Sequence, residues 1–189
     1  MVKHKERTEA TRRALLDAGR SLFAQRGYAN VSVADLAAAA GVTTGAIYHQ
    51  FGSKEGVFRV VYDELVRGTW ERVLAGRAAA PCAGLLGDCQ IYLDACADPA
   101  FFRITADGPS VIGWDQLVDG TRPLVEASLR AARERDELID CPVGPLARLM
   151  AAALKEAGIM IATAADPVAA RVQATEAVRS LLGGVLERR

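Results

Sequence analysis

The stretch that decides the fold is VSVADLAAAAGVTTGAIYHQFGSK, residues 31–54, which predicts two short helices joined by a tight turn. Ser32 is placed to cap the first helix, with Asp35 three residues later in its first turn. Gly41 suits the left-handed residue that ends such a helix, and Thr43 is placed to cap the next one. A turn of about three or four residues that contains Gly is the usual connection in a helix-turn-helix.

The second short helix has one inward and one outward side. Ile47 and Phe51, four residues apart, form the inward stripe, so Tyr48 and His49 are left without an obvious partner. Such a helix could offer these two side chains to bases or phosphates in a major groove. The residues that we expect to contact DNA are Ser32, Thr43, Thr44, Gly45, Ala46, Tyr48, His49 and Lys54, the last at the N-terminus of a helix capped by Ser53. The alternative is a three-helix packing unit with an ordinary solvated face.

A resemblance favours the DNA-binding interpretation. The run GVTTGAIYHQFGSKEGVF (residues 41–58), preceded by VSVADLAAAA (31–40) and SLFAQRGY (21–28), resembles the N-terminal signature of the TetR family of transcriptional regulators. It covers about the first third of the chain and thins beyond it. It implies an N-terminal DNA-binding domain followed by a more variable part that binds a ligand and forms dimers.

Composition predicts an all-α protein with a local basic region. Hydrophobic residues make up 51% of the 189-residue chain, many of them Ala, and the 7 Pro are few, which favours helices. The formal net charge is zero, yet residues 1–59 hold nine Lys and Arg against five Asp and Glu. A basic end on a neutral protein suits a local attraction to phosphates.

Several kinds of site and location find no support in the sequence. The four Cys, at 82, 89, 96 and 141, lack metal-ligand spacing, and the two His stand at 4 and 49, so we expect no metal site. We find no nucleophile elbow, phosphate loop or paired catalytic carboxylates, and expect neither catalytic residues nor a cofactor. A thiol sensor is conceivable, although buried Cys usually acts as a small hydrophobe. Without an apolar leader or spanning segment, we expect a soluble, cytoplasmic protein with no membrane partner.

The chain divides into two predicted domains. We expect residues 1–7 to be a disordered basic arm, and a helix from about Thr8 to Arg26 with an apolar face made by Leu15, Ala18, Leu22 and Phe23. A long helix after Ser53 would act as a lever toward the second domain. The run AGRAAAPCAGL (75–85) marks the boundary. The predicted domains are residues 6–66, which bind DNA, and residues 75–189, which bind ligand and dimerise.

The second domain offers candidates for an apolar ligand pocket. We expect helices over 85–97 and from Pro99, then a turn at Gly108 and Pro109. A helix from Trp114 either kinks or restarts between Gly120 and Pro123, and the sequence leaves both possibilities open. The proposed ligand contacts are Tyr92, Phe101, Phe102, Trp114, Met150 and Leu154, each of which is also plausible as plain core.

Two helices close the chain, from Leu146 and from Pro167. In the second, Val172, Thr175, Val178, Leu182 and Val185 recur at spacings of three and four, and we assign them to the dimer interface. The pair resembles the two-helix surface by which TetR-family subunits form a four-helix bundle. The alternative is two core helices of a monomer.

The leading hypothesis is a repressor that binds a palindromic double-stranded DNA operator as a homodimer and is released by a small-molecule effector. The rival from another class is a small α-helical ligand carrier or enzyme with an apolar cavity. A purely structural helical module is the third alternative, but it would leave the exposed Tyr48 and His49 unexplained.

Overall fold

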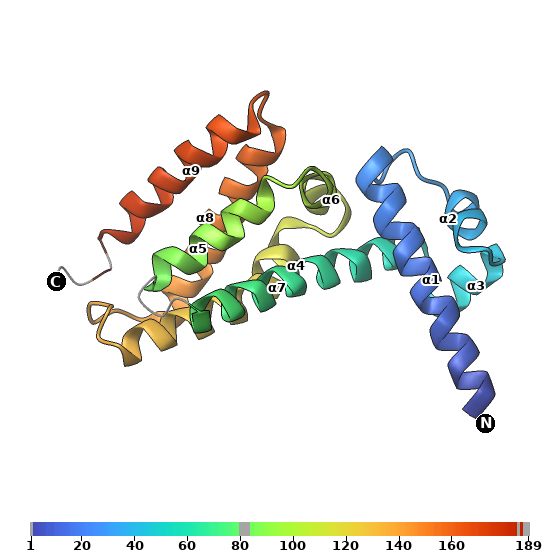
Figure 1. Ribbon diagram of the computed structural model, residues 1–189, viewed down its shortest axis with the longest axis horizontal. Helices are drawn as coiled ribbons and strands as arrows, with labels where there is room; N and C mark the ends of the chain where they lie inside the picture. Colours follow the sequence, from blue (N-terminus) through green and yellow to red (C-terminus); the bar gives the residue numbers. More distant parts are fainter. Residues whose placement is uncertain (1, 80–83, 185, 187–189) are drawn as a thin grey trace. The chain divides into compact units, whose positions relative to one another are not determined.

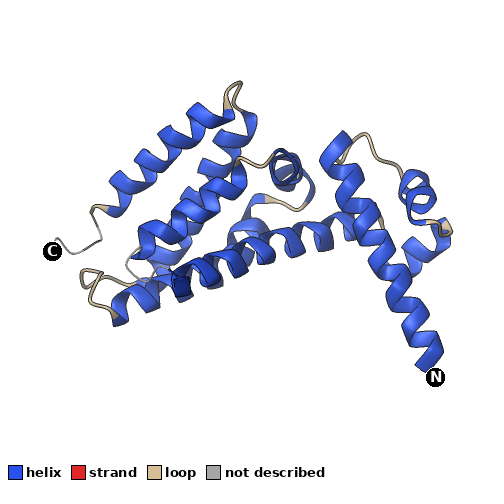
Figure 2. Cartoon of the chain, in the orientation of Figure 1, coloured by secondary structure: helices blue, strands red, loops and turns tan. Residues whose placement is uncertain are grey.

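The computed structural model describes residues 2–79, 84–184 and 186, and within these ranges it is built of helices alone (Figure 2). The expected all-α fold is therefore confirmed. The helices are α1 (Val2–Arg26), α2 (Val33–Ala40), α3 (Thr44–Phe51), α4 (Lys54–Ala79), α5 (Gly84–Cys96), α6 (Pro99–Val111), α7 (Trp114–Glu134), α8 (Val143–Thr163) and α9 (Pro167–Leu182). Figure 1 labels them in chain order.

The helices form two compact units that divide between Leu65 and Val66, inside α4. Unit 1 contains α1, α2, α3 and the first part of α4, and unit 2 contains the remainder of α4 and helices α5 to α9. None of the helices in the described ranges combines the length and apolar character needed to cross a membrane.

An aromatic cluster lies at the centre of unit 1. The ring of Phe58 in α4 meets those of Phe23 and Tyr28 edge to face, with centroids 5.2 and 5.1 Å apart. Such aromatic pairs contribute about 0.5–1.5 kcal/mol beyond their burial. A side-chain Cβ at Gly19 would lie 3.0 Å from Val57, so the absence of a side chain there lets α1 pack closely on α4.

The beginning of α1 differs from our expectation. We expected a disordered arm over residues 1–7, but the structure starts the helix at Val2. Positions 2–7 contain neither Pro nor Gly, so no residue interrupts the helix that continues into the core at Leu15. The first helix is therefore longer than the apolar face that anchors it.

In unit 2, α8 is the central helix and contacts α5, α6, α7 and α9. It passes close to α5 at Gly158, where an added Cβ would lie 3.1 Å from the Cys96 sulfur and 3.5 Å from the Tyr92 hydroxyl. The small residues of α8 thus let several helices approach it at once. Asp98 and Asp166 accept hydrogen bonds from the first amides of α6 and α9 and so cap these helices, which begin at Pro99 and Pro167 as predicted.

Two helices of unit 2 continue through a proline. We expected a turn at Gly108 and Pro109, but this expectation is wrong, since α6 runs through both to Val111 and Gly108 is buried in the core. Of the two possibilities left open for the next segment, a restart is excluded, since α7 is continuous through Pro123. Pro123 is exposed, so the carbonyl that loses its amide partner lies on the side where water can bind it.

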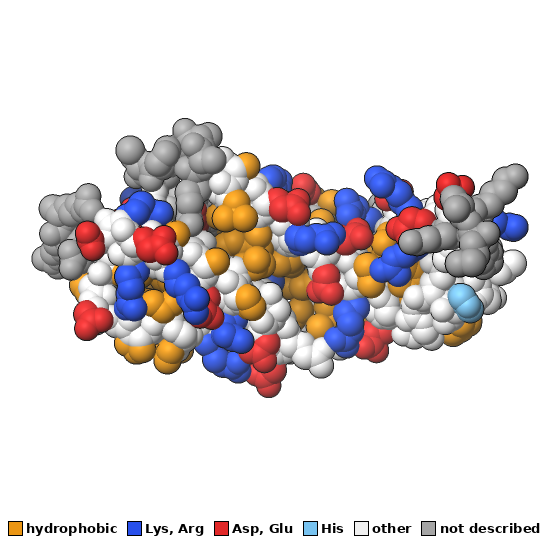
Figure 3. Space-filling view, turned by 90° about the horizontal axis from the view of Figure 1, so that it is seen from below, with side chains coloured by type: hydrophobic (Ala, Val, Ile, Leu, Met, Phe, Trp, Pro, Cys, Tyr) orange, Lys and Arg blue, Asp and Glu red, His pale blue; other side chains and the backbone are white. Residues whose placement is uncertain are grey.

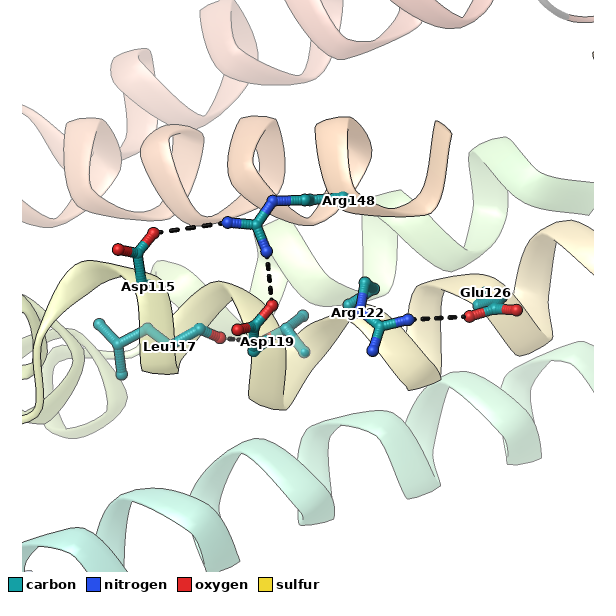
Figure 4. Close-up of polar contacts among 7 residues, drawn as sticks. Asp115, Leu117, Asp119, Arg122, Glu126 and Arg148 are labelled. Carbon is teal, nitrogen blue, oxygen red and sulfur yellow. Dashed lines mark hydrogen bonds and ion pairs between the residues drawn. The ribbon is translucent and has the colours of Figure 1, made fainter. Parts of the chain in front are cut away.

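Ion pairs join α7 and α8 at the surface. The guanidinium of Arg148 lies 2.6 Å from a carboxylate oxygen of Asp119 and 3.4 Å from one of Asp115 (Figure 4). Arg122 pairs with Glu126 one turn along the same helix, at 3.3 Å. Exposed pairs of this kind contribute little, about 0–1 kcal/mol each, so the packing of α8 is the main support of unit 2.

Two glycines of α4 give a test of this packing. A Cβ at Gly56 would lie 1.9 Å from the carbonyl oxygen of Phe51, whereas one at Gly68 would meet nothing within 4 Å. We expect Gly56→Ala to destabilise the protein by about 1–3 kcal/mol because backbone must move. Gly68→Ala should stabilise it by about 0.5–1 kcal/mol because Ala is the better helix former. Denaturant unfolding measures both, and equal effects would contradict the described contact between the α3 end and α4.

Candidate nucleic-acid interface

A complete capping box begins α2. The Ser32 amide donates to the carboxylate of Asp35 at 2.8 Å, and the Asp35 amide donates back to the Ser32 hydroxyl oxygen at 3.0 Å. The Ser32 hydroxyl also donates to that carboxylate, and these bonds hold the pKa of Asp35 below its ordinary value. The predicted cap is confirmed, and the Ser32 side chain that we assigned to DNA is engaged within the protein.

The turn between α2 and α3 is built by Gly41. Its φ is 66°, and the following Val42 amide donates to the carbonyl of Ala37 at 3.0 Å, which closes the end of α2. Thr43 is the N-cap of α3 by its extended backbone, but its side chain makes no capping bond. Our expectation that the Thr43 hydroxyl caps α3 is therefore wrong. Because Thr43 is exposed, its hydroxyl faces solvent beside the first amides of α3.

The two sides of α3 separate as expected. Ile47 is fully buried, and the half-buried Phe51 ring lies 4.8 Å from the guanidinium of Arg12. On the other side Tyr48 is 56% exposed and His49 is exposed beside it. The structure also places Thr43, Thr44 and Gly45 at the surface and leaves Ala46 half-buried. The predicted contact residues of α3 therefore share one accessible surface.

Lys54 is bound inside unit 1 rather than held out to solvent. Ser53 caps α4 as expected, its hydroxyl oxygen accepting from the Gly56 amide at 3.0 Å. The Lys54 ammonium donates to the carbonyls of Tyr28 at 3.0 Å and Val31 at 2.9 Å, and lies 3.9 Å from the centre of the Tyr28 ring. These contacts tie the start of α4 to the segment before α2. Lys54 thus has a structural role that we did not predict, and its contact with a phosphate stays a prediction.

A polar groove beside α3 was missed by the sequence interpretation. It measures about 290 Å³ and is lined by Arg7, Thr8 and Thr11 of α1 and by Ala46, His49 and Gln50 of α3. The Gln50 side-chain oxygen is shielded from solvent and has no hydrogen-bond partner among the described residues. The groove was missed because we assigned residues 1–7 to a disordered arm. With position 7 inside the helix, positions 7, 8 and 11 share one helical face.

Charge supports a local rather than a global attraction. Lys, Arg, Asp and Glu side chains are interspersed over the face drawn in Figure 3, and the net charge of the chain is zero. Within the described part of the chain, no group of three or more His, Cys, Asp or Glu is arranged to hold a metal ion.

The proposed ligand residues of unit 2 fall into two places. Tyr92 and Phe101 belong to a buried aromatic cluster, with ring centroids 6.4 Å apart, and Met150 and Leu154 are also buried. Phe102 is half-buried. Trp114 lines a separate surface groove of about 380 Å³ between α7 and α8. These six residues therefore do not form one site.

Trp70 belongs to the same buried cluster and was not among our candidates. Its ring stacks on Tyr92 with centroids 6.1 Å apart. Its indole N–H is buried without an acceptor in the described part of the chain. A buried donor without a partner costs about 1–3 kcal/mol, so this is a position where a ligand could contribute. Sequence alone indicates the aromatic residue but not the unpaired donor.

The proposed dimer residues of α9 divide between two faces. Val172 is 59% exposed, Thr175 is half-buried, and Val185 lies outside the described residues. Val178 and Leu182, at 4% and 0% exposure, belong to the core of their own protomer, which corrects their assignment to a surface. The exposed large hydrophobic residues of α8 and α9 are Leu149, Met160, Val168, Val172 and Leu181.

Two of the described cysteines, Cys89 and Cys96, are core residues, whereas Cys141 is half-buried. Burial raises the pKa of Cys89 and of Cys96 to about 12. Such thiols carry almost no thiolate near neutral pH, which argues against a sensor at either position. Cys82 lies outside the described residues.

Comparison with known proteins gives matches to related family models in both the N-terminal and the C-terminal part of the chain. Residues 15–61 match the family model described as bacterial regulatory proteins, tetR family, and residues 82–185 match the one described as tetracyclin repressor-like, C-terminal domain. A TetR-family transcriptional regulator of known structure from Pectobacterium atrosepticum has a TM-score of 0.84 and 30% identity, with 97% of both chains covered.

Curated relatives match over shorter stretches. The HTH-type transcriptional repressor KstR2 of Rhodococcus jostii (strain RHA1) is 34% identical over 100 residues, 53% of this chain and 46% of that protein. The A-factor receptor protein of Streptomyces griseus is 25% identical over 188 residues, 95% of this chain and 65% of the receptor. The chain thus matches about half the length of the Rhodococcus repressor.

The contacts of Lys54 predict a loss of stability on substitution. We expect Lys54→Met to destabilise the protein by about 1.5–3 kcal/mol, because two carbonyls lose a charged donor. Arg67→Met is the matched control in the same helix, since Arg67 is exposed and its ion pair with Glu71 is 4.0 Å long. Its effect should stay within about 0.5 kcal/mol. Urea unfolding decides the point, and equal midpoints for the two variants would contradict the structural role of Lys54.

Proposed function

This chain belongs to the TetR family of bacterial regulatory proteins, and on that premise we propose that it represses transcription by binding a palindromic operator as a homodimer. A small molecule bound in unit 2 would release it from the DNA. The family consists of transcriptional regulators, which favours this function over the rival of an enzyme or carrier with an apolar cavity.

The exposed side of α3 is the observation that carries the proposal. A two-turn helix presents an aromatic and an imidazole side chain to solvent, Tyr48 and His49, with Thr44 and Gly45 at its start. A helix of this width fits the major groove, where His and Tyr can reach base edges or phosphates. Gly45 has no side chain to hold DNA away from the helix N-terminus, whose amides attract phosphate.

Dimerisation is supported by the exposed apolar residues of the last two helices. Leu149 and Met160 stand on the outer side of α8, and Val168 and Val172 on that of α9. Each is more than half exposed, and covering them by a second copy would remove apolar surface from water. Two-fold symmetry would place one α3 per subunit in successive major grooves, about one turn apart.

The effector site that we propose is the buried cluster of Trp70, Tyr92 and Phe101 in unit 2. An effector that accepts a hydrogen bond from the Trp70 indole would satisfy its unpaired donor. Since α4 contributes residues to both units, a change in α4 could reach the DNA-binding unit. A coupling of about 1–3 kcal/mol would lower operator affinity about 5- to 150-fold.

The proposed DNA contact by the exposed side of α3 is tested by substituting the two large side chains on that side. We expect Tyr48→Ala and His49→Ala each to lose about 1–3 kcal/mol of specific operator binding, because contacts to the DNA disappear. Ser21→Ala is the control, since Ser21 is exposed on α1 and its hydroxyl oxygen accepts a hydrogen bond from the Gln25 amide one turn along the same helix. Fluorescence anisotropy with DNA flanking the gene gives the affinities. Unchanged affinity in both variants would refute the proposed surface.

The dimer surface is tested by adding charge. We expect Met160→Glu and Val172→Glu to yield folded monomers, because a carboxylate would be buried between subunits. Leu74→Glu makes the same change at a residue of α4 that is likewise more than half exposed, and should leave the dimer intact. Sedimentation velocity distinguishes the species. Dimers in both α8 and α9 variants would place the interface elsewhere.

A further inference from the structure

The interior of unit 2 holds two charged side chains of opposite sign beside the aromatic cluster. Asp88 of α5 is 3% exposed and Lys155 of α8 is 4% exposed. The Lys155 ammonium lies 5.9 Å from the centre of the Tyr92 ring, and Asp88 stands one helical turn before Tyr92. Among the residues that the structure describes, no other Asp, Glu, Lys or Arg is buried. The formal charge of this interior is therefore zero.

Both charges border the contact between α5 and α8. On α8, Gly158 stands one turn after Lys155 and packs so closely on α5 that an added Cβ would lie 3.1 Å from the Cys96 sulfur. Burial raises the pKa of the Cys96 thiol to about 12, and the positive charge of Lys155 opposes this rise, so the ammonium lies near that thiol too. A ligand beside the Tyr92 ring would therefore lie within reach of both charges.

The Trp70 indole is the group of this cluster that lacks a partner. Asp88 and Lys155 each take part in further interactions within the protein. The Trp70 ring stacks on Tyr92 and is 4% exposed, yet its N–H meets no acceptor in the described part of the chain. A buried donor in this state gains more from an acceptor than a solvated one does. This interior therefore lacks a neutral acceptor rather than a counter-ion.

From this balance of charge we propose that the effector is an uncharged molecule whose carbonyl oxygen accepts a hydrogen bond from the Trp70 indole. The proposal rests on the proposed function and names the class of molecule that its effector site takes. That class is an ester, amide or ketone with an apolar body that packs against Tyr92 and Phe101. A carboxylate or an ammonium would add a charge that the interior does not balance, which costs far more than burying a carbonyl that gains a hydrogen bond.

The position of Trp70 connects this hydrogen bond to α4. Trp70 lies four residues after Val66, the first residue of unit 2, on the helix that contributes to both units. A ligand bonded to the indole therefore acts on α4 directly and needs no other helix to pass the effect on.

The first test compares three probes that share a phenyl group and differ in charge. Phenylacetate is negative, phenethylammonium is positive, and methyl phenylacetate is neutral. Trp114→Phe leaves Trp70 as the single tryptophan of the chain, so its fluorescence reports binding at the proposed site. We expect methyl phenylacetate to bind roughly tenfold or more tightly than either ion, because only the ester keeps the interior neutral.

Three outcomes of this comparison would overturn the proposal. Tighter binding of phenylacetate would assign the site to an anion balanced by Lys155. Tighter binding of phenethylammonium would assign it to a cation balanced by Asp88. An ester that leaves the fluorescence of Trp70 unchanged up to its limit of solubility would show that no such molecule binds there.

The second test removes the donor and the acceptor of the hydrogen bond in turn. Trp70→Phe removes the N–H and keeps an aromatic ring, and butylbenzene has nearly the size of the ester without its carbonyl. We expect the ratio of ester affinity to butylbenzene affinity, measured by equilibrium dialysis, to fall about three- to tenfold in this variant. Phe101→Leu is the control, since it reduces apolar contact with both probes and should keep the ratio. An unchanged ratio in Trp70→Phe would refute the hydrogen bond.

The third test changes the charge of the interior. Asp88→Asn makes it positive at nearly constant side-chain size. We expect the ratio of phenylacetate affinity to methyl phenylacetate affinity to rise roughly tenfold, because the carboxylate then meets an unbalanced ammonium. Asp94→Asn is the matched control on α5, since Asp94 is exposed and pairs with Arg171 at the surface. Equal ratios in the two variants would show that buried charge does not select the ligand.

Binding of the probes is measured without DNA, so it is judged separately from the proposed function. Methyl phenylacetate that binds as expected and weakens the complex with operator DNA supports both. If the ester binds as expected and the DNA complex is unaffected, the chemistry of the site stands and the proposed release of DNA fails. If the wild-type protein binds no DNA from its own locus, repression fails, and the three tests above still decide the class of ligand.

Discussion

An eight-residue helix cannot hold its own shape in water, and this constraint governs unit 1. α3 exists because Ile47 is buried beneath it and because Gly56 lets the carbonyl of Phe51 approach α4. The outer side of α3 does not pack against the rest of unit 1, so it can carry the exposed Tyr48 and His49. The proposed DNA contact therefore depends on a support that lies wholly on the other side of the helix.

The local parts of this unit could be predicted from the sequence. The capping box of Ser32 and Asp35 and the glycine at position 41 act over three to five residues, and the structure shows both as expected. The stripe of Ile47 and Phe51 follows from helical spacing alone. Interactions that span one turn leave a readable pattern, because both partners stand close together in the chain.

Contacts between distant segments could not be predicted in the same way. Lys54 binds carbonyls 26 and 23 residues away, and no local pattern distinguishes it from a lysine that faces solvent. In α9, the spacing indicates which residues share a stripe but not whether it faces the protomer's own core, where Val178 and Leu182 lie. The unpaired indole N–H of Trp70 could not be predicted either, because its lack of an acceptor follows from the packing around it.

Hydrogen–deuterium exchange with and without DNA tests the central claim most directly. The protein should be compared alone and with the fragment of its own locus that it binds most tightly at low salt. If the outer side of α3 enters the duplex, amides of Thr44–Phe51 should exchange markedly more slowly in the complex, while α8 and α9 should change little. Unchanged exchange across α3 in a saturated complex would contradict the account, because the DNA would then be bound by another surface.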